Sequence, residues 1–421
     1  MRWNTLGLAL SVTSLSYAFP SQAQETATVL PKGIFRIRAV GLQAAAVTHS
    51  FDNDGNRREL LADLNGRIVS SGDIAQKNAQ FQPLYQALND FQAGLGDALF
   101  QSSFQARTQA EVRQYVFAAE YGLTPRVSLG LIVPTVDMSF TRTSFTTLNE
   151  QNIAAVRERT KGIKALEEGV DKFAQSLPST ASYENAVFTD LGYETPHDFS
   201  FKSLGDIEIG AKYQFLNVDD GHLLMTTQGG FRLPTTTHVR YYPNPLDRNG
   251  GDDQLDFALR WVSQYTPDNA WVFSLSAQYT YQFADRRNMY VLKPGESGLP
   301  RLDADHNEQV RRDLGEIVDT EVSAGYGFLE NQFRTYSLWT FSSKGQDGFS
   351  GGKDLDYSSL SRNTRTLSHR AEIGLGYSTI PLFRKKRFSV PLETKIAYNT
   401  ALNGMNVSDS KYLRLDMIVY F

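Results

Sequence analysis

The clearest pattern in this chain is a strict alternation of apolar and polar residues. From Trp271 to Phe283 the odd-numbered positions read Trp, Phe, Leu, Ala, Tyr, Tyr and Phe, whereas the even-numbered positions are mostly Ser, Gln and Thr. A period of two residues predicts a β-strand with one apolar and one polar face. This stretch is longer than the usual strand of about five or six residues, and it suits a tilted strand that crosses a membrane.

The same alternation recurs along most of the chain. A soluble β-sandwich is the alternative interpretation, but it would hide its apolar faces and rarely needs strands of this length. We therefore predict an all-β membrane protein, an antiparallel transmembrane β-barrel of about twelve strands, with fourteen as the alternative if a long loop contains a hairpin. The expected strands are 34–50, 107–121, 126–142, 204–217, 222–233, 254–266, 271–285, 316–329, 332–343, 365–379, 388–402 and 411–421.

The connections between these segments alternate in length. Short turns, such as 122–125 and 218–221, follow every second segment, and mostly long loops follow the others. Outer-membrane barrels have short turns on the periplasmic side and long loops outside the cell. With an even number of strands, both ends of the chain fall on the short-turn side. We expect one barrel domain over 24–421, with external loops 51–106 and 143–203.

These two long loops carry helical periodicity. Val156, Ile163, Val170 and Leu177 recur every seven residues, which predicts an amphipathic helix over 153–177. In the first loop an apolar face is shared by Leu84, Leu88, Phe91 and Leu95. Neither helix can bury its apolar stripe alone, so we expect the two segments to pack on each other. Above or inside the barrel mouth, such a pair would form a lid.

The first 23 residues have the features of a secretory signal peptide. Arg2 is the only charge before Glu25, an apolar stretch covers 6–15, and small residues at Ser21 and Ala23 precede a predicted cut. The chain contains no Cys, so the exported protein has no disulfide. Together with the barrel pattern, this signal peptide predicts that the protein is located in the outer membrane of a Gram-negative bacterium.

Composition narrows the class further. Of the 421 residues 41% are apolar and 12% are aromatic, and the formal net charge is −4. This balance argues against a nucleic-acid partner. The chain has no run of 18 apolar residues, which argues against a helical membrane protein. The predicted partners are the lipid bilayer, a small-molecule solute, and the barrel-assembly machinery through the C-terminal Phe421.

Charged residues occupy many of the positions that the alternation points into the barrel. Acidic and basic side chains are nearly balanced, so a strongly ion-selective pore is not indicated. Twelve strands lie between a filled barrel of eight and an open one of 16–18, which predicts a narrow or plugged passage. Alternatively, these charges pair across strands and partly fill the lumen. The lumen-lining candidates are Arg36, Arg38, Glu120, Arg126, Glu208, Lys212, Arg232, Asp256, Arg260, Asp319, Glu321, Arg370, Glu372, Arg414 and Asp416.

Motifs for catalysis and metal binding find little support. The six histidines form no H-E-x-x-H pattern, and the G-x-S-x-G nucleophile motif is absent. A barrel phospholipase would need H-x-S, whereas His49 and Ser50 are adjacent. The stretch from Asp52 resembles the start of a calcium loop, but Arg57 stands where Gly is required, so a turn is the simpler interpretation. We expect no enzyme, no catalytic residue, no metal and no cofactor.

One stretch resembles a known family. The segment from Tyr121 to Pro134 resembles the Y-G-L-T-x-R-x-S-L-G-x-x-x-P hairpin of the meta-pathway phenol-degradation family of outer-membrane proteins. Residues 205–213 are similar to that family's G-D-x-x-x-G-x-K-Y strand. The resemblance covers about 120–260 by motif and the C-terminal strands by pattern only. It implies an outer-membrane transporter that imports aromatic or other hydrophobic small molecules, and it supplies no ligand-contacting residue.

The functional hypothesis is passive uptake of a small, hydrophobic or aromatic solute. A structural or surface-interaction barrel without transport is the first alternative, and a barrel enzyme is the second. The interior distinguishes them, because a pocket lined with apolar and aromatic side chains favours transport. A fully packed charged interior favours the structural role.

Overall fold

The computed structural model describes residues 26–60, 67–72, 75, 79–148, 150–176, 189–194, 197–236, 254–268 and 270–421. The predicted signal peptide at 1–23 lies outside these described residues. The chain divides into two compact units. The described residues of the first unit fall within 26–60, 109–141 and 198–421, and those of the second fall within 67–108 and 142–197.

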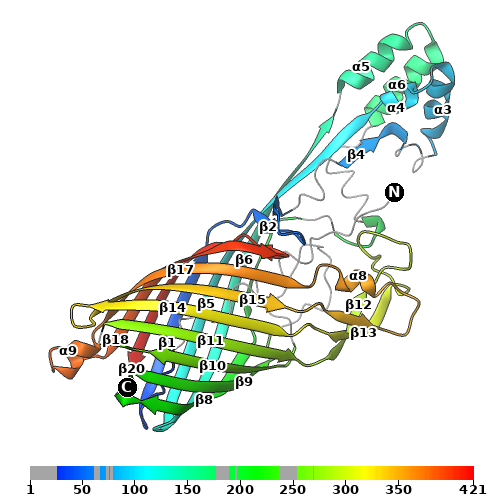
Figure 1. Ribbon diagram of the computed structural model, residues 1–421. Helices are drawn as coiled ribbons and strands as arrows, with labels where there is room; N and C mark the ends of the chain where they lie inside the picture. Colours follow the sequence, from blue (N-terminus) through cyan, green and yellow to red (C-terminus); the bar gives the residue numbers. More distant parts are fainter. Residues whose placement is uncertain are drawn as a thin grey trace. The chain divides into compact units, whose positions relative to one another are not determined.

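The first unit contains a closed antiparallel barrel of twelve strands, which confirms the predicted fold class (Figure 1). Its first and last strands pair with each other, from Arg36 opposite Tyr420 to Ala44 opposite Tyr412. The ring closes because β6 also pairs with β5. Around the barrel the order is β1 (Phe35–Ala44), β20 (Lys411–Tyr420), β18 (Leu392–Met405), β17 (Thr366–Ser378), β15 (Phe333–Lys344), β14 (Ile317–Phe328), β11 (Trp271–Gln282), β10 (Asp256–Tyr265), β9 (Leu223–Leu233), β8 (Ile207–Val218), β6 (Val127–Leu148) and β5 (Gln101–Thr124).

One additional strand continues the line of β8 beside β6. β6 pairs with β8 up to Ile132 and with β7 (Phe199–Leu204) from Thr135 onward. Pro134 lies at the interruption and has no backbone N–H to donate. The strand expected over 204–217 is thus β8 apart from its first three residues, and β7 lies almost entirely within the segment expected as the loop 143–203.

The outward face of the barrel is apolar, as a lipid-facing surface requires. Its exposed side chains include Ile37, Phe117, Leu129, Leu259, Phe273, Leu275, Val322, Ile373, Ile396, Leu413, Leu415 and Met417. A closed barrel satisfies its backbone hydrogen bonds internally, so it can cross lipid without a polar edge. A barrel with this surface belongs in the outer membrane of a Gram-negative bacterium. Within the described part of the chain, no helix has the length and apolar character needed to cross a bilayer.

Aromatic side chains mark the short-turn end of the barrel. Trp271 at the start of β11 packs against Tyr326 of β14, with ring centroids 5.0 Å apart. Phe333 of β15 lies between Phe328, at 5.7 Å, and Tyr377 of β17, at 5.0 Å. Such a girdle is typical of the membrane interface.

Two small sheets extend the barrel strands on the long-loop side. One consists of β12 (Asp285–Tyr290), β13 (Asn307–Asp313) and β16 (Gly348–Ser350), followed by helix α8 (Ser358–Ser361). The other consists of β19 (Val407–Ser408), β2 (His49–Phe51) and β3 (Arg57–Glu59). In the turn before β3, Oδ1 of Asp52 accepts hydrogen bonds from the backbone of Asp54 (2.9 Å) and Asn56 (2.8 Å). This geometry agrees with the turn interpretation. On the short-turn side lie a 3₁₀ turn at Asp219–Gly221 and α9 (Ile380–Arg384).

The second unit is a helical cluster with its own core. It contains β4 (Arg67–Ser70), α3 (Gln82–Phe91), α4 (Leu95–Ala98), α5 (Glu150–Arg159) and α6 (Lys164–Ser176). The prediction that the two loop segments pack on each other is confirmed. Their shared core is formed by Leu88, Leu95, Leu99, Phe100, Val156, Leu166, Val170 and Phe173.

Two details of the helix prediction were wrong. The segment 153–177 is not one helix, because Gly162, with a φ of 90°, lies in the turn that separates α5 from α6. Ile163 and Phe91, expected on the apolar stripes, are 37% and 47% exposed and do not join the core. Leu177 lies outside the described residues.

Candidate functional site: the barrel interior

A connected polar network covers the buried faces of β15, β17, β18 and β20. Arg414 forms ion pairs with Glu372 (3.0 Å) and Asp416 (3.1 Å). It also donates a hydrogen bond to the hydroxyl of Tyr336 (3.1 Å), which in turn donates to Glu372 (2.9 Å). Asp416 also pairs with Arg38 of β1 (2.8 Å). Four strands thus contribute to this part of the network, in which the Asp416 carboxylate lies between the guanidinium groups of Arg38 and Arg414.

Arg370 extends this network toward the long-loop end of the barrel. Its guanidinium donates to the side-chain oxygen of Asn399 (2.8 Å) and to the backbone oxygen of Ser410 (3.0 Å). Asn399 donates to Glu372 (3.2 Å), which joins the two parts. The guanidinium carbon of Arg370 also lies 5.2 Å from the ring centroid of Tyr412, within the range of a cation–π contact.

A second polar cluster lies on β8, β9 and β10. Arg232 forms ion pairs with Glu208 (3.1 Å) and with Asp256 (3.2 Å). Beside them, Arg260 donates to the side-chain oxygen of Gln278 on β11 (2.7 Å). Farther along the ring, Ser276 donates to Glu321 (3.4 Å), and Asp319 is buried nearby on the same strand. Most of these charges therefore have partners across the strands.

The remaining candidates are placed differently. Arg36 pairs with Glu120 between β1 and β5. Lys212 is buried and bonds to the N-terminal segment, as described below. Arg126, in contrast, is exposed in the tight turn between β5 and β6, and the structure does not bring it together with the other candidates.

The segment that precedes β1 enters the barrel at its short-turn end. Lys212 donates to the backbone oxygen of Thr26 (3.2 Å), and Gln214 donates to that of Ala27 (3.1 Å). The backbone N–H of Leu30 donates to the hydroxyl of Ser128 (2.9 Å). Ala27 is fully buried against Leu224 of β9 and Val262 of β10. We call residues 26–30 the N-terminal plug.

One glycine makes room for the chain that follows the plug. A Cβ atom at Gly122 would lie 2.1 Å from the backbone oxygen of Pro31 and 2.7 Å from that of Leu30. The backbone of Gly122 also accepts a hydrogen bond from Gly33 (2.8 Å) and donates one to Ile34 (2.9 Å). Only glycine allows this close approach. The Gly in the motif from Tyr121 therefore has a structural role beside the plug.

Another part of the interior is apolar. Buried side chains from β1, β5 and β6 pack together with two phenylalanines of β7, and Phe140 stacks on Phe199 at 4.9 Å. Two residues of the chain that follows β1, Val47 and Leu60, also pack there. We call this cluster the apolar wall; its members on the strands are Val40, Leu42, Ala44, Ala110, Val112, Val116, Ile132, Val136, Met138, Phe140, Phe199, Phe201 and Tyr412.

The sequence reasoning missed both the plug and the apolar wall. The plug has no alternation to reveal it, because its five residues form no strand. The apolar wall did leave a signal. On β5 the outward Tyr115 and Phe117 alternate with inward valines, so both faces are apolar where one polar face was expected. A run of apolar residues on the inward faces of neighbouring strands is what distinguishes this part of the barrel.

Comparisons with known proteins support the fold. No protein-family model and no curated protein matches the chain. An outer membrane channel from Pseudomonas putida F1 is 11% identical, and the match covers 95% of this chain and 100% of that chain with a TM-score of 0.52. The transport unit of the autotransporter AIDA-I from Escherichia coli is 6% identical over 99% of this chain and 98% of its own, with a TM-score of 0.39. The toluene transporter TodX of Pseudomonas putida is 8% identical over 93% of this chain and 90% of its own, with a TM-score of 0.33. Of these three, only the first match has a TM-score above 0.5, and it shows that the protein has the fold of an outer-membrane barrel.

Proposed function

We propose that this protein is a channel for the passive uptake of small hydrophobic or aromatic solutes across the outer membrane. The observation that carries the proposal is the apolar wall, whose members Val116, Val136 and Met138 are buried on the inward faces of β5 and β6. Valine, methionine and phenylalanine side chains offer an apolar solute a favourable surface and offer an ion none. The fold that the chain shares with an outer membrane channel supports a transport role.

The polar residues fit a supporting role in this proposal. We propose that the charged candidates on the buried strand faces line and narrow the passage. Because Arg414 and Arg232 are each paired with carboxylates, their charges are largely neutralised, and a strong ion-selective field is not expected. The N-terminal plug further narrows the short-turn end. Transport through such a passage requires no catalytic step.

The test compares uptake by two variants with one substitution each. In Met138→Asn a buried member of the apolar wall becomes polar, whereas in Thr340→Asn a buried residue is changed on the inward face of β15, outside that wall. We expect proteoliposomes with Met138→Asn to take up an arene such as toluene about tenfold more slowly, since the solute loses apolar contacts in transit. Thr340→Asn should retain the rate of the unmodified protein.

The outcomes separate transport from the alternative. If Met138→Asn and the unmodified protein take up the arene equally, the apolar wall is not the route. If neither protein exceeds empty liposomes, the barrel acts as a structural or surface-interaction protein.

A further inference from the structure

The turn between β17 and β18, residues 379–391, gathers positive charge at one point of the short-turn rim. Its positions 384–387 are four consecutive cations, and the turn contains no acidic residue. The short turns at 218–221 and 267–269 contain aspartates instead. The accumulation is therefore particular to this turn, and we call it the basic turn.

Hydrogen bonds hold the basic turn in a defined shape. Thr379, buried at its base, donates from its hydroxyl to the backbone oxygen of Val390 (2.6 Å) and accepts from the backbone N–H of Leu392 (2.8 Å). Within the turn, the backbone N–H of Lys386 donates to the backbone oxygen of Phe383 (2.9 Å). An ordered turn thus presents the four cations.

Most of this positive charge is not neutralised by the protein. Lys385 forms an ion pair with Glu330 of the adjacent β14–β15 turn. Glu330 also lies within electrostatic range of Arg387, but one carboxylate cannot balance four cations. Among the described residues, no ion pair or side-chain hydrogen bond includes Arg384, Lys386 or Arg387, and all three are exposed. The basic turn therefore offers charge to an external anion.

Large apolar side chains are exposed beside these cations. They are Phe383, Phe388 and Val390. Exposed apolar side chains that cluster beside polar ones mark a contact with a membrane or another protein. Cations interleaved with large apolar residues are typical of a segment in the membrane interface, where the apolar side chains enter the acyl boundary and the charges stay among the headgroups.

The aromatic girdle next to the basic turn faces the lipid. On β17 the exposed Ile373 and Leu375 alternate with buried residues, and Tyr377 continues the exposed series. On β14 the exposed Tyr326 is followed on the same face by the exposed Phe328. The basic turn therefore begins where the lipid-facing surface of these strands ends.

Short stretches of chain connect the girdle to the basic turn. Tyr377 precedes Ile380 of α9 by three residues, so their Cα atoms are at most about 11 Å apart. Glu330, the partner of Lys385, follows Phe328 by two residues, or at most about 7 Å. Figure 1 shows α9 at the rim, beside the β14–β15 turn. Since the headgroup layer is about 5–8 Å thick, the basic turn leaves the barrel at the level of the headgroups.

We propose that the basic turn binds anionic phospholipid headgroups in the periplasmic leaflet of the outer membrane. The short-turn end of an outer-membrane barrel faces the periplasm, where the leaflet consists of phospholipids. Arg384, Lys386 and Arg387 contact the lipid phosphates, and Phe383 and Phe388 enter the acyl boundary. This contact fixes one point of the rim to the membrane and is independent of the solute that passes through the barrel.

The test measures equilibrium binding of fluorescent phosphatidylglycerol and phosphatidylcholine to the full-length protein in a non-ionic detergent. Each basic side chain contributes about a factor of five at an anionic lipid surface, so R384Q and K386Q should each bind phosphatidylglycerol about fivefold more weakly and the double variant about thirtyfold. The matched control is K32Q/R126Q, because Lys32 and Arg126 are exposed at the same end of the barrel; its affinity should be unchanged. All four side chains are exposed, so the variants should fold, which heat-modifiable migration on a gel checks.

Two further measurements identify the ligand. Phe388→Ser should weaken the binding of both lipids by the same factor, whereas R384Q/K386Q should leave phosphatidylcholine binding unchanged. Inorganic phosphate at millimolar concentration should leave phosphatidylglycerol binding unchanged, and full displacement would show a site for free anions and overturn the assignment to lipid. Equal binding of phosphatidylglycerol by the unmodified protein and R384Q/K386Q, or an equal loss in K32Q/R126Q, would overturn the proposal.

Discussion

At the scale of single residues, Arg414 holds the polar network of the barrel together. Its side chain is 2% exposed and contacts Glu372, Asp416 and Tyr336. Arg414→Gln leaves the Glu372 carboxylate buried without a cationic partner, so we expect the barrel to lose about 3–5 kcal/mol of unfolding free energy. Urea titration of the heat-modifiable band in detergent measures this loss.

The control for Arg414 is on the same strand. Lys411→Gln removes a positive charge from an exposed position of β20 and should change the unfolding free energy by less than about 0.5 kcal/mol. A similar loss in both variants would mean that net charge, and not the buried network, determines the stability.

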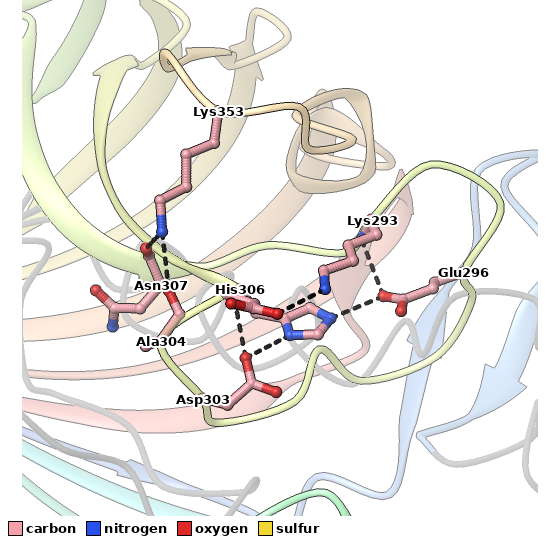
Figure 2. Close-up of polar contacts among 8 residues, drawn as sticks. Lys293, Glu296, Asp303, Ala304, His306, Asn307 and Lys353 are labelled. Atoms are coloured by element: carbon pink, nitrogen blue, oxygen red, sulfur yellow. Dashed lines mark hydrogen bonds and ion pairs between the residues drawn. The ribbon is translucent and has the colours of Figure 1, made fainter.

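His306 gives the external loop between β12 and β13 a dependence on pH. Figure 2 shows its buried ring between two carboxylates, with Nδ1 2.6 Å from Asp303 and Nε2 3.0 Å from Glu296. The hydrogen bond from His306 holds the pKa of Asp303 below its ordinary value of 3.8. Burial raises the pKa of Glu296, but the backbone hydrogen bond from Lys293 and the contact with His306 outweigh it and hold this pKa below 4.5.

The sign of the pH effect follows from these lowered values. A carboxyl whose pKa is lower in the folded loop stabilises the loop above its ordinary pKa and stops doing so as the pH falls through the folded value. We therefore expect hydrogen exchange in 291–306, corrected for intrinsic rates, to accelerate when the pH falls below about 4. His306→Gln, whose amide lacks the ring that lies between the two carboxylates, should exchange faster already at neutral pH. If both proteins show the same pH profile, His306 does not hold the loop.

At the scale of elements, the core of the helical unit can be tested with a matched pair of substitutions. Val170 on α6 is fully buried, whereas Ile163 in the turn before it is 37% exposed. Val170→Asp places an unpaired charge in the core and should destabilise the unit by about 3–5 kcal/mol. Limited proteolysis within 150–176 reports this loss, while migration of the folded barrel stays unchanged. Ile163→Asp should leave the cleavage rate as it was, and rapid cleavage of that variant would mean that the core is assigned to the wrong face.

The N-terminal plug offers a second test at this scale. Deleting residues 26–30 removes the contacts with Lys212, Gln214 and Ser128 and should raise single-channel conductance in planar bilayers. Gly122→Ala forces the backbone near Pro31 to shift and should raise conductance by a smaller amount. Gly130→Ala is the control, because a Cβ there meets no atom within 4 Å. Unchanged conductance after the deletion would mean that the plug does not limit the passage.

The elements differ in how well the sequence predicted them. Strands such as β14 and β20 were predicted to within one residue at each end, because lipid on one side and a polar interior on the other impose alternation. The helix pair was predicted only in outline, since a glycine at 162 can end a helix or be tolerated within it. The plug could not be predicted, because five residues held by side chains of β6 and β8 carry no period of their own.

At the scale of the whole molecule, the exposed ring of Phe421 allows a test of barrel assembly. Phe421 is 66% exposed, and its backbone exchanges hydrogen bonds with Phe35 of β1 (2.8 and 3.0 Å). We predict that its ring is read by the barrel-assembly machinery, so Phe421→Ser should lower the amount of folded protein in the outer membrane. Leu329→Ser is the control, because Leu329 is 64% exposed in a short turn. Equal levels of folded protein in the two variants would contradict the prediction.

The candidate site was predictable as a set of residues but not as a set of contacts. The alternation assigned Arg38 and Asp416 to the inward face, yet these two residues lie 378 positions apart in the chain. Their pairing depends on the register between the first and last strands, which the sequence of either strand alone does not determine. Tyr336 and Asn399 were missed for the same reason, since each is ordinary on its own strand and gains its role only from the partners opposite.

The N-terminal plug has a consequence for the order of folding. Residues 26–30 are synthesised before β6, β8, β9 and β10, the strands that surround them in the finished protein. Either the barrel strands assemble around a plug that is already present, or the plug threads into a barrel that has already closed. Five residue steps separate Leu30 from Phe35, a tether of about 18 Å at most. Throughout biogenesis the plug is thus confined near one rim, and after closure it can withdraw toward the periplasm only by the length of that tether.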